Sequence, residues 1–509
     1  MPLNPNVAHD AVNAYTSKTD ADKVKSYPQF LMEVELNSFR HIHGLKIDFT
    51  HPVSVISGSN RSGKTSVLMT IACSHYNFDR PDVANGAWKR ATWSHLVRFT
   101  PHDSQSADWI YHIMYREGDA TKTVEGYRRC ATKKWGGAGK KEGQIGKPTS
   151  GHVLGGRHVC LIDLNRINPG RHLTTSTYAK ARRATGKTIN NQDDINKYLS
   201  YIFETDYDIS KLTEAADNMV FQFREVDGTK YSSFNTASGE DALVNLLNQI
   251  LHLPENSLIL IDELEIGLHP KIQRRLMDII YIISQKQHKQ FIITSHSYAV
   301  IDSVPAEARI FIEHIGDTFE CKKGLSTYET LTRMDSEAFP VVTFYVEDDV
   351  SQKIVDNAIK EINQKECGFA RLARVVVVGS ADCTYNYSRT RNKLRGDEKI
   401  TTKAACILDG DMNGNAKYPP ENNLFFHYSS EAPEKMLVKA YLNNNADTTL
   451  QYHVDNSNPH YLFKKMAEMG LATDTNDAFD KCFNAYRQSD KGGAHFEQLK
   501  DFIKRNCSC

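Results

Sequence analysis

The sequence lacks any apolar run that approaches the length of a membrane-spanning helix, which needs about 18 residues. It also lacks an excess of either charge, because its 509 residues include 62 basic and 62 acidic ones. This balance excludes a protein that coats nucleic acid with an all-basic surface. It still allows a local basic groove, because steering depends on where the charges lie.

Cysteine motifs and a leader segment are missing as well. The ten cysteines are scattered, and none lies in a CxxC pair or in a Cys/His cluster with zinc spacing. The first residues do not combine a basic stretch with an apolar run, which is the pattern of a secretory signal peptide. We therefore expect a reduced, cytoplasmic protein that does not contact a membrane.

Short apolar runs occur in two series, separated by a change of character near residues 335–340. Continuous runs of this kind are typical of parallel strands that are covered on both faces. We therefore predict an α/β protein with two domains, residues 1–338 and 339–509, and a variable basic insertion at about 120–190. The apolar runs are 53–56, 258–261 and 291–293 in the first series, and 341–346, 375–378 and 404–408 in the second.

A phosphate-binding loop is the strongest motif of the chain. Residues 58–65 match the full pattern GxxxxGK[ST], follow a predicted strand and open an apolar helix. Backbone N–H groups of such a loop turn toward phosphate, and the helix N-terminus adds its dipole. The pattern predicts ATP with Mg²⁺, where Lys64 neutralises the β- and γ-phosphates and Thr65 binds the ion. The predicted nucleotide-binding residues are Gly58, Asn60, Arg61, Ser62, Gly63, Lys64, Thr65 and Ser66.

Three further features follow in the order expected of an ATPase. Asp262 and Glu263 end an apolar run, where we expect Asp262 to hold Mg²⁺ and Glu263 to polarise the attacking water. Acids at a strand end are often only helix caps, and a lone histidine is usually structural. The upstream Ser238-Gly239-Glu240, which begins an apolar helix, and the downstream His296 together favour the catalytic interpretation. His296 then senses the γ-phosphate.

This ordered set resembles the ABC ATPases of the DNA-repair and defence branch over roughly residues 30–335. Members commonly follow the acidic pair with Gly-Leu-His-Pro, and residues 262–270 read Asp-Glu-Leu-Glu-Ile-Gly-Leu-His-Pro, with Leu264 at a position where proline is common. Thr236–Glu240 resembles the signature motif but lacks its second glycine. The resemblance implies that the signature of one subunit closes on ATP held by another, so that two ATPase heads pair. Gln105 is a weak candidate for the Q-loop glutamine.

A second acidic constellation lies beyond residue 338. Glu347 follows one apolar run, and Asp409-Gly410-Asp411 follows another. Because carboxyl ends of parallel strands meet at one sheet edge, these acids are expected to hold Mg²⁺, which prefers oxygen ligands. The alternative is that Asp-Gly-Asp is a plain turn.

The order of strand-Glu, strand-Gly and strand-Asp-x-Asp resembles a TOPRIM domain. An ABC ATPase followed by TOPRIM resembles the OLD-family nucleases, which include retron-associated and Gabija-type phage-defence effectors. The resemblance implies that Glu347, Asp409 and Asp411 are catalytic metal ligands for Mg²⁺, with Mn²⁺ as an alternative. Glu434 is our choice for an additional metal-binding acid, with Glu431 as the alternate. Asp348 stands where the family often has glycine.

Basic residues form three clusters, each of which is either a phosphate-contacting surface or a solvated loop. The clusters are Arg128, Arg129, Lys133, Lys134, Lys140, Lys141 and Lys147; Arg171, Lys180, Arg182, Arg183 and Lys187; and Arg389, Arg391, Lys393 and Arg395.

The sequence leaves two functional hypotheses open. The first is an ATP-regulated, metal-dependent nuclease of phage defence that acts on nucleic acid, DNA in preference to RNA, as a homodimer or larger homo-oligomer. A defence-system partner protein, or an RNA/DNA partner such as a retron, fits this reading. The second is a non-nucleolytic ATPase clamp or scaffold. A transporter subunit is disfavoured, because transport has no use for the second acidic domain.

Overall fold

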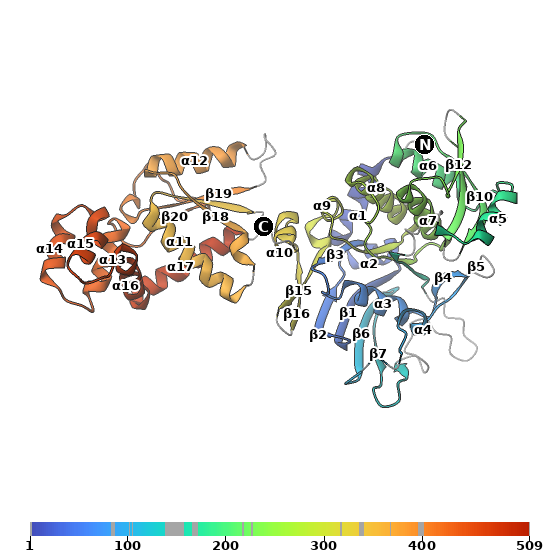
Figure 1. Ribbon diagram of the computed structural model, residues 1–509, viewed down its shortest axis with the longest axis horizontal. Helices are drawn as coiled ribbons and strands as arrows, with labels where there is room; N and C mark the ends of the chain where they lie inside the picture. Colours follow the sequence, from blue (N-terminus) through green and yellow to red (C-terminus); the bar gives the residue numbers. More distant parts are fainter. Residues whose placement is uncertain are drawn as a thin grey trace. The chain divides into compact units, whose positions relative to one another are not determined.

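The computed structural model divides the chain into two compact units, Met1–Thr330 and Leu331–Cys509 (Figure 1). We refer to them as unit 1 and unit 2 and describe each by itself. The helix α10 (Thr327–Met334) contains the point where the chain passes from one to the other. The structure describes residues 3–82, 87–100, 102–103, 105–137, 157–164, 172–215, 218–224, 228–315, 318–334, 340–366, 368–394 and 402–507.

The core of unit 1 is an eight-stranded, mostly parallel sheet. Its central strands are buried along their whole length, in agreement with the continuous apolar runs of the sequence. The outer pairs β15–β16 and β4–β5 are antiparallel. In order across the sheet, the strands are β16 (Thr318–Lys323), β15 (Arg309–Ile315), β3 (Val53–Gly58), β14 (Gln290–Thr294), β13 (Leu258–Ile261), β9 (Val159–Ile162), β4 (Phe78–Asp82) and β5 (Ala87–Arg90).

The strand β9 is a finding that the sequence did not anticipate. It pairs in parallel with β13 in the middle of the sheet, although it lies in the range 120–190 that was expected to be an insertion. The same range also contains β7, β8 and the helix α5 (Thr175–Arg183). Lys140, Lys141, Lys147 and Arg171 of the predicted basic clusters lie outside the described residues.

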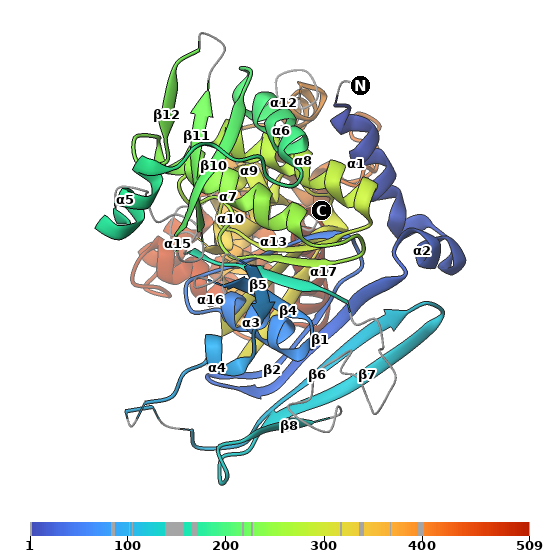
Figure 2. The same ribbon diagram turned by 90° about the vertical axis from the view of Figure 1, so that its right-hand side faces the viewer.

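A second, antiparallel sheet of five strands forms its own layer in unit 1. The helix α3 (Lys64–Ser74) lies between this layer and the central sheet, and contacts both (Figure 2). Apolar side chains of both sheets and of α3 join in one core cluster. The strands, in order, are β2 (Ile42–Asp48), β1 (Gln29–Phe39), β6 (Trp109–Glu117), β7 (Ala120–Arg128) and β8 (Trp135–Gly137).

Further helices of unit 1 contact the central sheet or one another. The helix α8 (Pro270–Gln287) contacts β3 and β14, and α7 (Ser238–His252) contacts β9. A small antiparallel sheet packs on α5, α6 and α7. The remaining elements are α1 (Pro5–Asn13), α2 (Asp20–Ser26), α4 (Trp93–Leu96), α6 (Gln192–Phe203), α9 (Tyr298–Ile301), β10 (Asp208–Ala215), β11 (Asn218–Arg224) and β12 (Lys230–Ser232).

Unit 2 is built on four parallel strands with helices packed on them. Its order is β18 (Ala373–Val377), β17 (Val342–Val346), β19 (Lys403–Leu408) and β20 (Leu424–Phe426). All four strands therefore direct their carboxyl ends to one edge. The helices are α11 (Asp349–Lys365), α12 (Ala381–Leu394), α13 (Pro433–Leu442), α14 (Thr448–Asn456), α15 (Leu462–Glu468), α16 (Thr475–Gln488) and α17 (Asp490–Cys507), and the short 3₁₀ turns include η5 (Phe369–Arg371), η6 (Gly410–Met412) and η7 (Pro459–Tyr461).

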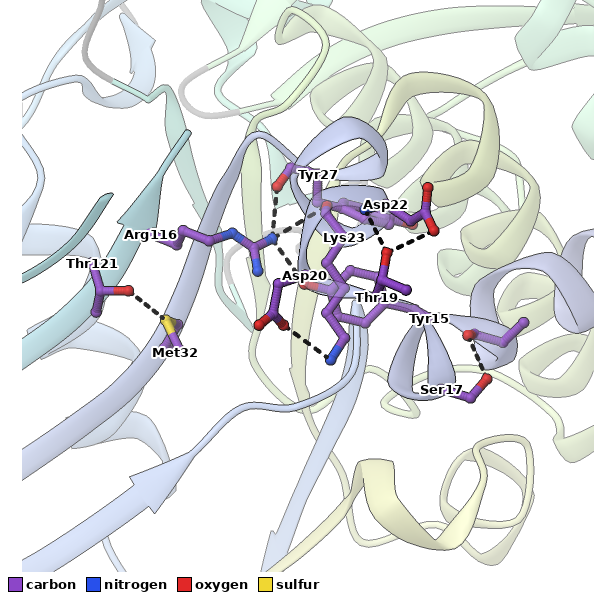
Figure 3. Close-up of polar contacts among 11 residues, drawn as sticks. Tyr15, Ser17, Thr19, Asp20, Asp22, Lys23, Tyr27, Met32, Arg116 and Thr121 are labelled. Carbon is purple, nitrogen blue, oxygen red and sulfur yellow. Dashed lines mark hydrogen bonds and ion pairs between the residues drawn. The ribbon is translucent and has the colours of Figure 1, made fainter. Parts of the chain in front are cut away.

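The first helices of unit 1 are fastened to the antiparallel sheet by Arg116 of β6 (Figure 3). One guanidinium nitrogen, Nη2, donates to the hydroxyl of Tyr15 at 3.0 Å, to the carbonyl of Tyr27 at 3.0 Å and to the carbonyl of Lys23 at 3.3 Å. The Arg116 side chain is buried, so water cannot replace these bonds without cost.

We expect Arg116→Met to lower the free energy of unfolding of unit 1 by about 3 kcal/mol, because several hydrogen bonds from a buried charged group are lost. Urea unfolding followed by tryptophan fluorescence measures this change, since all four tryptophans lie in unit 1. The exposed Arg182 of α5 provides the control, Arg182→Met. Equal stability of the two variants would contradict the assignment.

Candidate functional site

The phosphate loop connects β3 to α3 in the centre of unit 1. A side chain at Gly58 would collide with the carbonyl of Ile312, and Gly63 has a left-handed φ of 95°. Only glycine fits the first position sterically, and it is the residue that adopts the second without strain. The loop therefore needs both glycines of the motif for its shape.

Lys64 bends back over this loop. Its ammonium donates to the carbonyl of Gly58 at 2.8 Å and to the carbonyl of Ser59 at 3.0 Å. Burial lowers the pKa of Lys64, and the charges of Glu263 and Asp262 act against that effect. A buried cation at the N-terminus of a helix is suited to an anion, and the triphosphate of ATP supplies one.

Asp262 joins three parts of the site through hydrogen bonds. Thr65 of the phosphate loop donates from its hydroxyl to Asp262 Oδ2 at 3.0 Å. Thr294, at the end of β14, donates to Asp262 Oδ1 at 2.6 Å and accepts the N–H of Glu263 at 2.8 Å. A hydroxyl and a carboxylate held at this distance fit Mg²⁺, which binds oxygen ligands and retains several waters.

Glu265 and His296 form the side of the site next to the acidic pair. The backbone N–H of His296 donates to Glu265 Oε1 at 2.5 Å, while Glu265 Oε2 is buried without a hydrogen-bond partner among the described residues. Burial, and secondarily the charge of Lys64, lower the pKa of His296. The imidazole is therefore uncharged at neutral pH and can donate one hydrogen bond. His296 thus lies close enough to Lys64 for the lysine charge to lower its pKa.

The signature residues lie at the start of α7. A side chain at Gly239 would collide with the carbonyl of Gly267, so the helix start packs closely against the turn that follows the acidic pair. The carboxylate of Glu240 accepts hydrogen bonds from Tyr231 and Thr236. Glu240 is thus hydrogen-bonded within unit 1, and its contact with the nucleotide stays a prediction.

A pocket of about 410 Å³ adjoins the phosphate loop, and sequence reasoning did not find it. Its wall includes Arg40, His41 and Trp109, and a ring nitrogen of His41 lies 3.1 Å from the carbonyl of Arg61 in the loop. Gln105 also lines the pocket, but its amide donates to the carbonyls of Ala107 and Arg128. The structure thus gives Gln105 a scaffolding role.

Two basic residues of the first cluster have partners within the fold. Arg128 is buried against the ring of Phe99, at 3.6 Å from its centroid. Arg129 forms an ion pair of 2.7 Å with Asp108.

The second acidic cluster lies at the carboxyl edge of the sheet in unit 2. The backbone N–H of Asp409, directly after β19, donates to Glu347 Oε1 at 2.7 Å, and Ser351 donates to Asp409 Oδ1 at 3.0 Å. Burial raises the pKa of Asp409 to about 8, and the charges of Glu347 and Asp348 contribute. Burial followed by the charge of Asp411 also raises the pKa of Glu347. Acids that repel one another at a strand edge are suited to binding a cation.

Gly410 distinguishes this turn from a plain surface turn. A side chain at Gly410 would collide with the carbonyls of Ser429 and His427. Of the two acids considered for the fourth ligand, Glu431 forms an ion pair with Lys439, whereas Glu434 is buried and contacts His460 at 2.7 Å.

Comparisons with known proteins support the ATPase part of this site. The family model described as "AAA domain, putative AbiEii toxin, Type IV TA system" matches residues 163–302, a range that includes the signature, the acidic pair and His296. The prediction of an ATPase domain is therefore confirmed for this range, which lies within the α/β unit 1. No curated protein matches the sequence. In the described part of the chain, no helix has the length and apolar character needed to cross a bilayer.

Three solved structures illustrate the structural likeness. The SMC head domain from Thermotoga maritima has 13% identity and a TM-score of 0.36, with 58% of this chain and 98% of that chain covered. The Smc head domain bound to the C-terminal domain of ScpA, derived from Pyrococcus furiosus, has 9% identity, a TM-score of 0.37 and coverages of 58% and 96%. RecF with ATP has 15% identity, a TM-score of 0.35 and coverages of 58% and 98%. Likeness at this level supports no conclusion about substrate or partner.

We expect Glu263→Gln to retain ATP while hydrolysis falls by about 100-fold or more, because the amide cannot act as a base toward water. Phosphate release and equilibrium ATP binding measure the two effects separately. Glu255→Gln, which changes an exposed acid just before β13, is the matched control. Hydrolysis at the wild-type rate in folded Glu263→Gln would exclude Glu263 as the base.

Proposed function

We propose that the chain is an ATP-dependent nuclease that uses a divalent metal ion to cut nucleic acid, with DNA preferred to RNA, and that it acts in the cytoplasm as an effector of antiviral defence. The observation that carries this proposal is the contact between Glu347 and Asp409 at adjacent strand ends, 2.7 Å from carboxylate oxygen to backbone nitrogen. The TOPRIM-like interpretation of unit 2 is part of the proposal. Its support is the parallel sheet with acids at one edge.

The metal of the nuclease site is held by Glu347, Asp409 and Asp411, with Glu434 as the additional acid. Mg²⁺ or Mn²⁺ at this place polarises a phosphodiester and lowers the pKa of a bound water. The chain contributes the oxygen donors and a partly buried edge. The basic helix α12, with Arg389, Arg391 and Lys393, packs on β19, and its Asn392 bonds to Ala404 near the start of that strand, so this basic end of the helix lies toward the edge opposite the acids. Arg395 lies outside the described residues.

In the ATPase site, Lys64 and the phosphate loop hold ATP, and Thr65 with Asp262 holds its Mg²⁺. Glu263 orients the attacking water, and the neutral His296 donates to the γ-phosphate. We further propose that two copies pair head to head, so that Ser238 and Gly239 of one copy close on ATP held by the other. Binding and hydrolysis of ATP then control the nuclease activity.

The defence role follows from two sources. The order of motifs resembles that of OLD-family effectors, and the description of the matched family names a toxin of a toxin–antitoxin system. A toxin-like nuclease requires tight control, and a nucleotide switch in the same chain provides it.

A scaffold that binds nucleic acid without cutting it is the second candidate. The observation that favours it is Asp348, which caps α11 by accepting the N–H of Ser351 at 2.7 Å and stands where TOPRIM domains often have glycine.

We expect the double variant Asp409→Ala/Asp411→Ala to lose plasmid cleavage in Mg²⁺ or Mn²⁺ and to lose phage protection, because the metal loses two of its carboxylates. ATP hydrolysis persists, since its residues belong to unit 1. The exposed Asp501 of α17 provides the control, Asp501→Ala.

Cleavage that survives in the folded double variant would rule out this nuclease site. Loss of cleavage combined with full phage protection would favour the scaffold instead.

A further inference from the structure

Glu434 places a carboxylate oxygen in the interior of unit 2 without a partner. The residue lies in the first turn of α13 and its side chain is 2% exposed. Oε1 lies 2.7 Å from Nδ1 of His460, whereas Oε2 is buried and has no hydrogen-bond partner among the described residues. Such burial is costly unless another group satisfies the oxygen, and a cation next to it removes that cost.

Two other residues place ligand atoms near the Glu434 carboxylate. One ligand atom from each of Asp348, Glu434 and His460 lies within 4.8 Å of the others. They come from three separate elements, the N-cap of α11, the first turn of α13 and the 3₁₀ turn η7. The Asp348 cap uses Oδ1, and the exposed His460 opens the cluster to solvent. An ion can therefore enter without unfolding the unit.

We propose that Asp348, Glu434 and His460 bind a divalent transition-metal ion, such as Mn²⁺ or Zn²⁺. A set of two carboxylates and one imidazole provides oxygen and nitrogen donors together. Imidazole suits transition metals, whereas Mg²⁺ takes oxygen ligands. Three protein ligands leave further positions for water or for a phosphate oxygen.

This ion also reduces the charge repulsion among the neighbouring acids. Asp348 follows Glu347 in the chain, and its negative charge contributes to the unfavourable field at Asp409. An ion on Asp348 offsets that charge and explains how aspartate is tolerated at a position next to the predicted nuclease ligands. The inference itself rests on the geometry of three residues and does not require that the chain cut nucleic acid.

The alternative is that no metal ion binds, and that the ion pair of His460 with Glu434 only holds η7 against α13. Electron spin-echo measurements on bound Mn²⁺ separate the two, because a nitrogen ligand couples to the manganese electron spin and an oxygen ligand does not. The probe is Mn²⁺ alone, added to the full chain after removal of metals by a chelator and without nucleotide.

The wild-type chain is expected to show nitrogen coupling, and His460→Ala is expected to lose that coupling together with one bound Mn²⁺ per chain. His460 is exposed, so its replacement leaves the fold intact. His43→Ala, at an exposed histidine of β2, is the matched control and retains the signal. Asp409→Ala also retains it, because Asp409 is not one of the three proposed ligands.

Absence of nitrogen coupling in the wild type, or its persistence in His460→Ala, would overturn the proposal and leave the ion pair. Failure of the nuclease proposal looks different, since the coupling then remains while the wild type leaves plasmid intact.

Discussion

The hydrogen bond between Thr65 and Asp262 is the contact on which the ATPase site depends. Thr65 lies in the first turn of α3, Asp262 directly follows β13, and Thr294 of β14 donates to the other oxygen of the same carboxylate. Two parallel neighbours of one sheet, β13 and β14, are thereby fixed relative to the helix that follows the phosphate loop. Thr294 also accepts the N–H of Glu263, so the hydroxyl that binds Asp262 also positions the backbone of Glu263.

Both acidic sites of the chain use one constraint of α/β architecture. Parallel strands end at the same edge, so short loops bring residues distant in sequence within hydrogen-bond reach. In unit 1 the edge also carries a buried cation, Lys64, which offsets the charge of Asp262 and Glu263. In unit 2, burial and, after it, the charges of neighbouring acids raise the pKa of Asp409 to about 8. The sheet edge of unit 1 therefore suits an anion that carries a metal ion, whereas the sheet edge of unit 2 suits a metal ion alone.

The features that could be predicted from the sequence are those with a pattern in neighbouring residues of the chain. The phosphate loop has fixed glycine spacing, and β13, β14, β17 and β19 are continuous apolar runs. The acidic pair and the Asp-Gly-Asp turn follow such runs directly, so their place at a sheet edge followed from chain order.

What the sequence missed depends on contacts between distant segments. The strand β9 has only four residues, Val159–Ile162, and becomes recognisable through pairing with β13. Thr294 lies two residues before the predicted His296, but its role requires knowing that β14 adjoins β13. His460 is separated from Glu434 by 26 positions and from Asp348 by more than a hundred, with no motif to connect them. The tight fit of Gly239 against Gly267 likewise exists only in the folded chain.

Equilibrium binding of ATP to the full chain, measured with Mg²⁺ for wild type and for Lys64→Ala, tests the central claim most directly. The account predicts one ATP per chain for the wild type and no measurable binding for the variant, because the triphosphate loses its buried countercharge. Lys286→Ala, at an exposed lysine of α8, should bind as the wild type does. Unchanged ATP affinity in a folded Lys64→Ala variant would contradict the assignment of this loop as the nucleotide site.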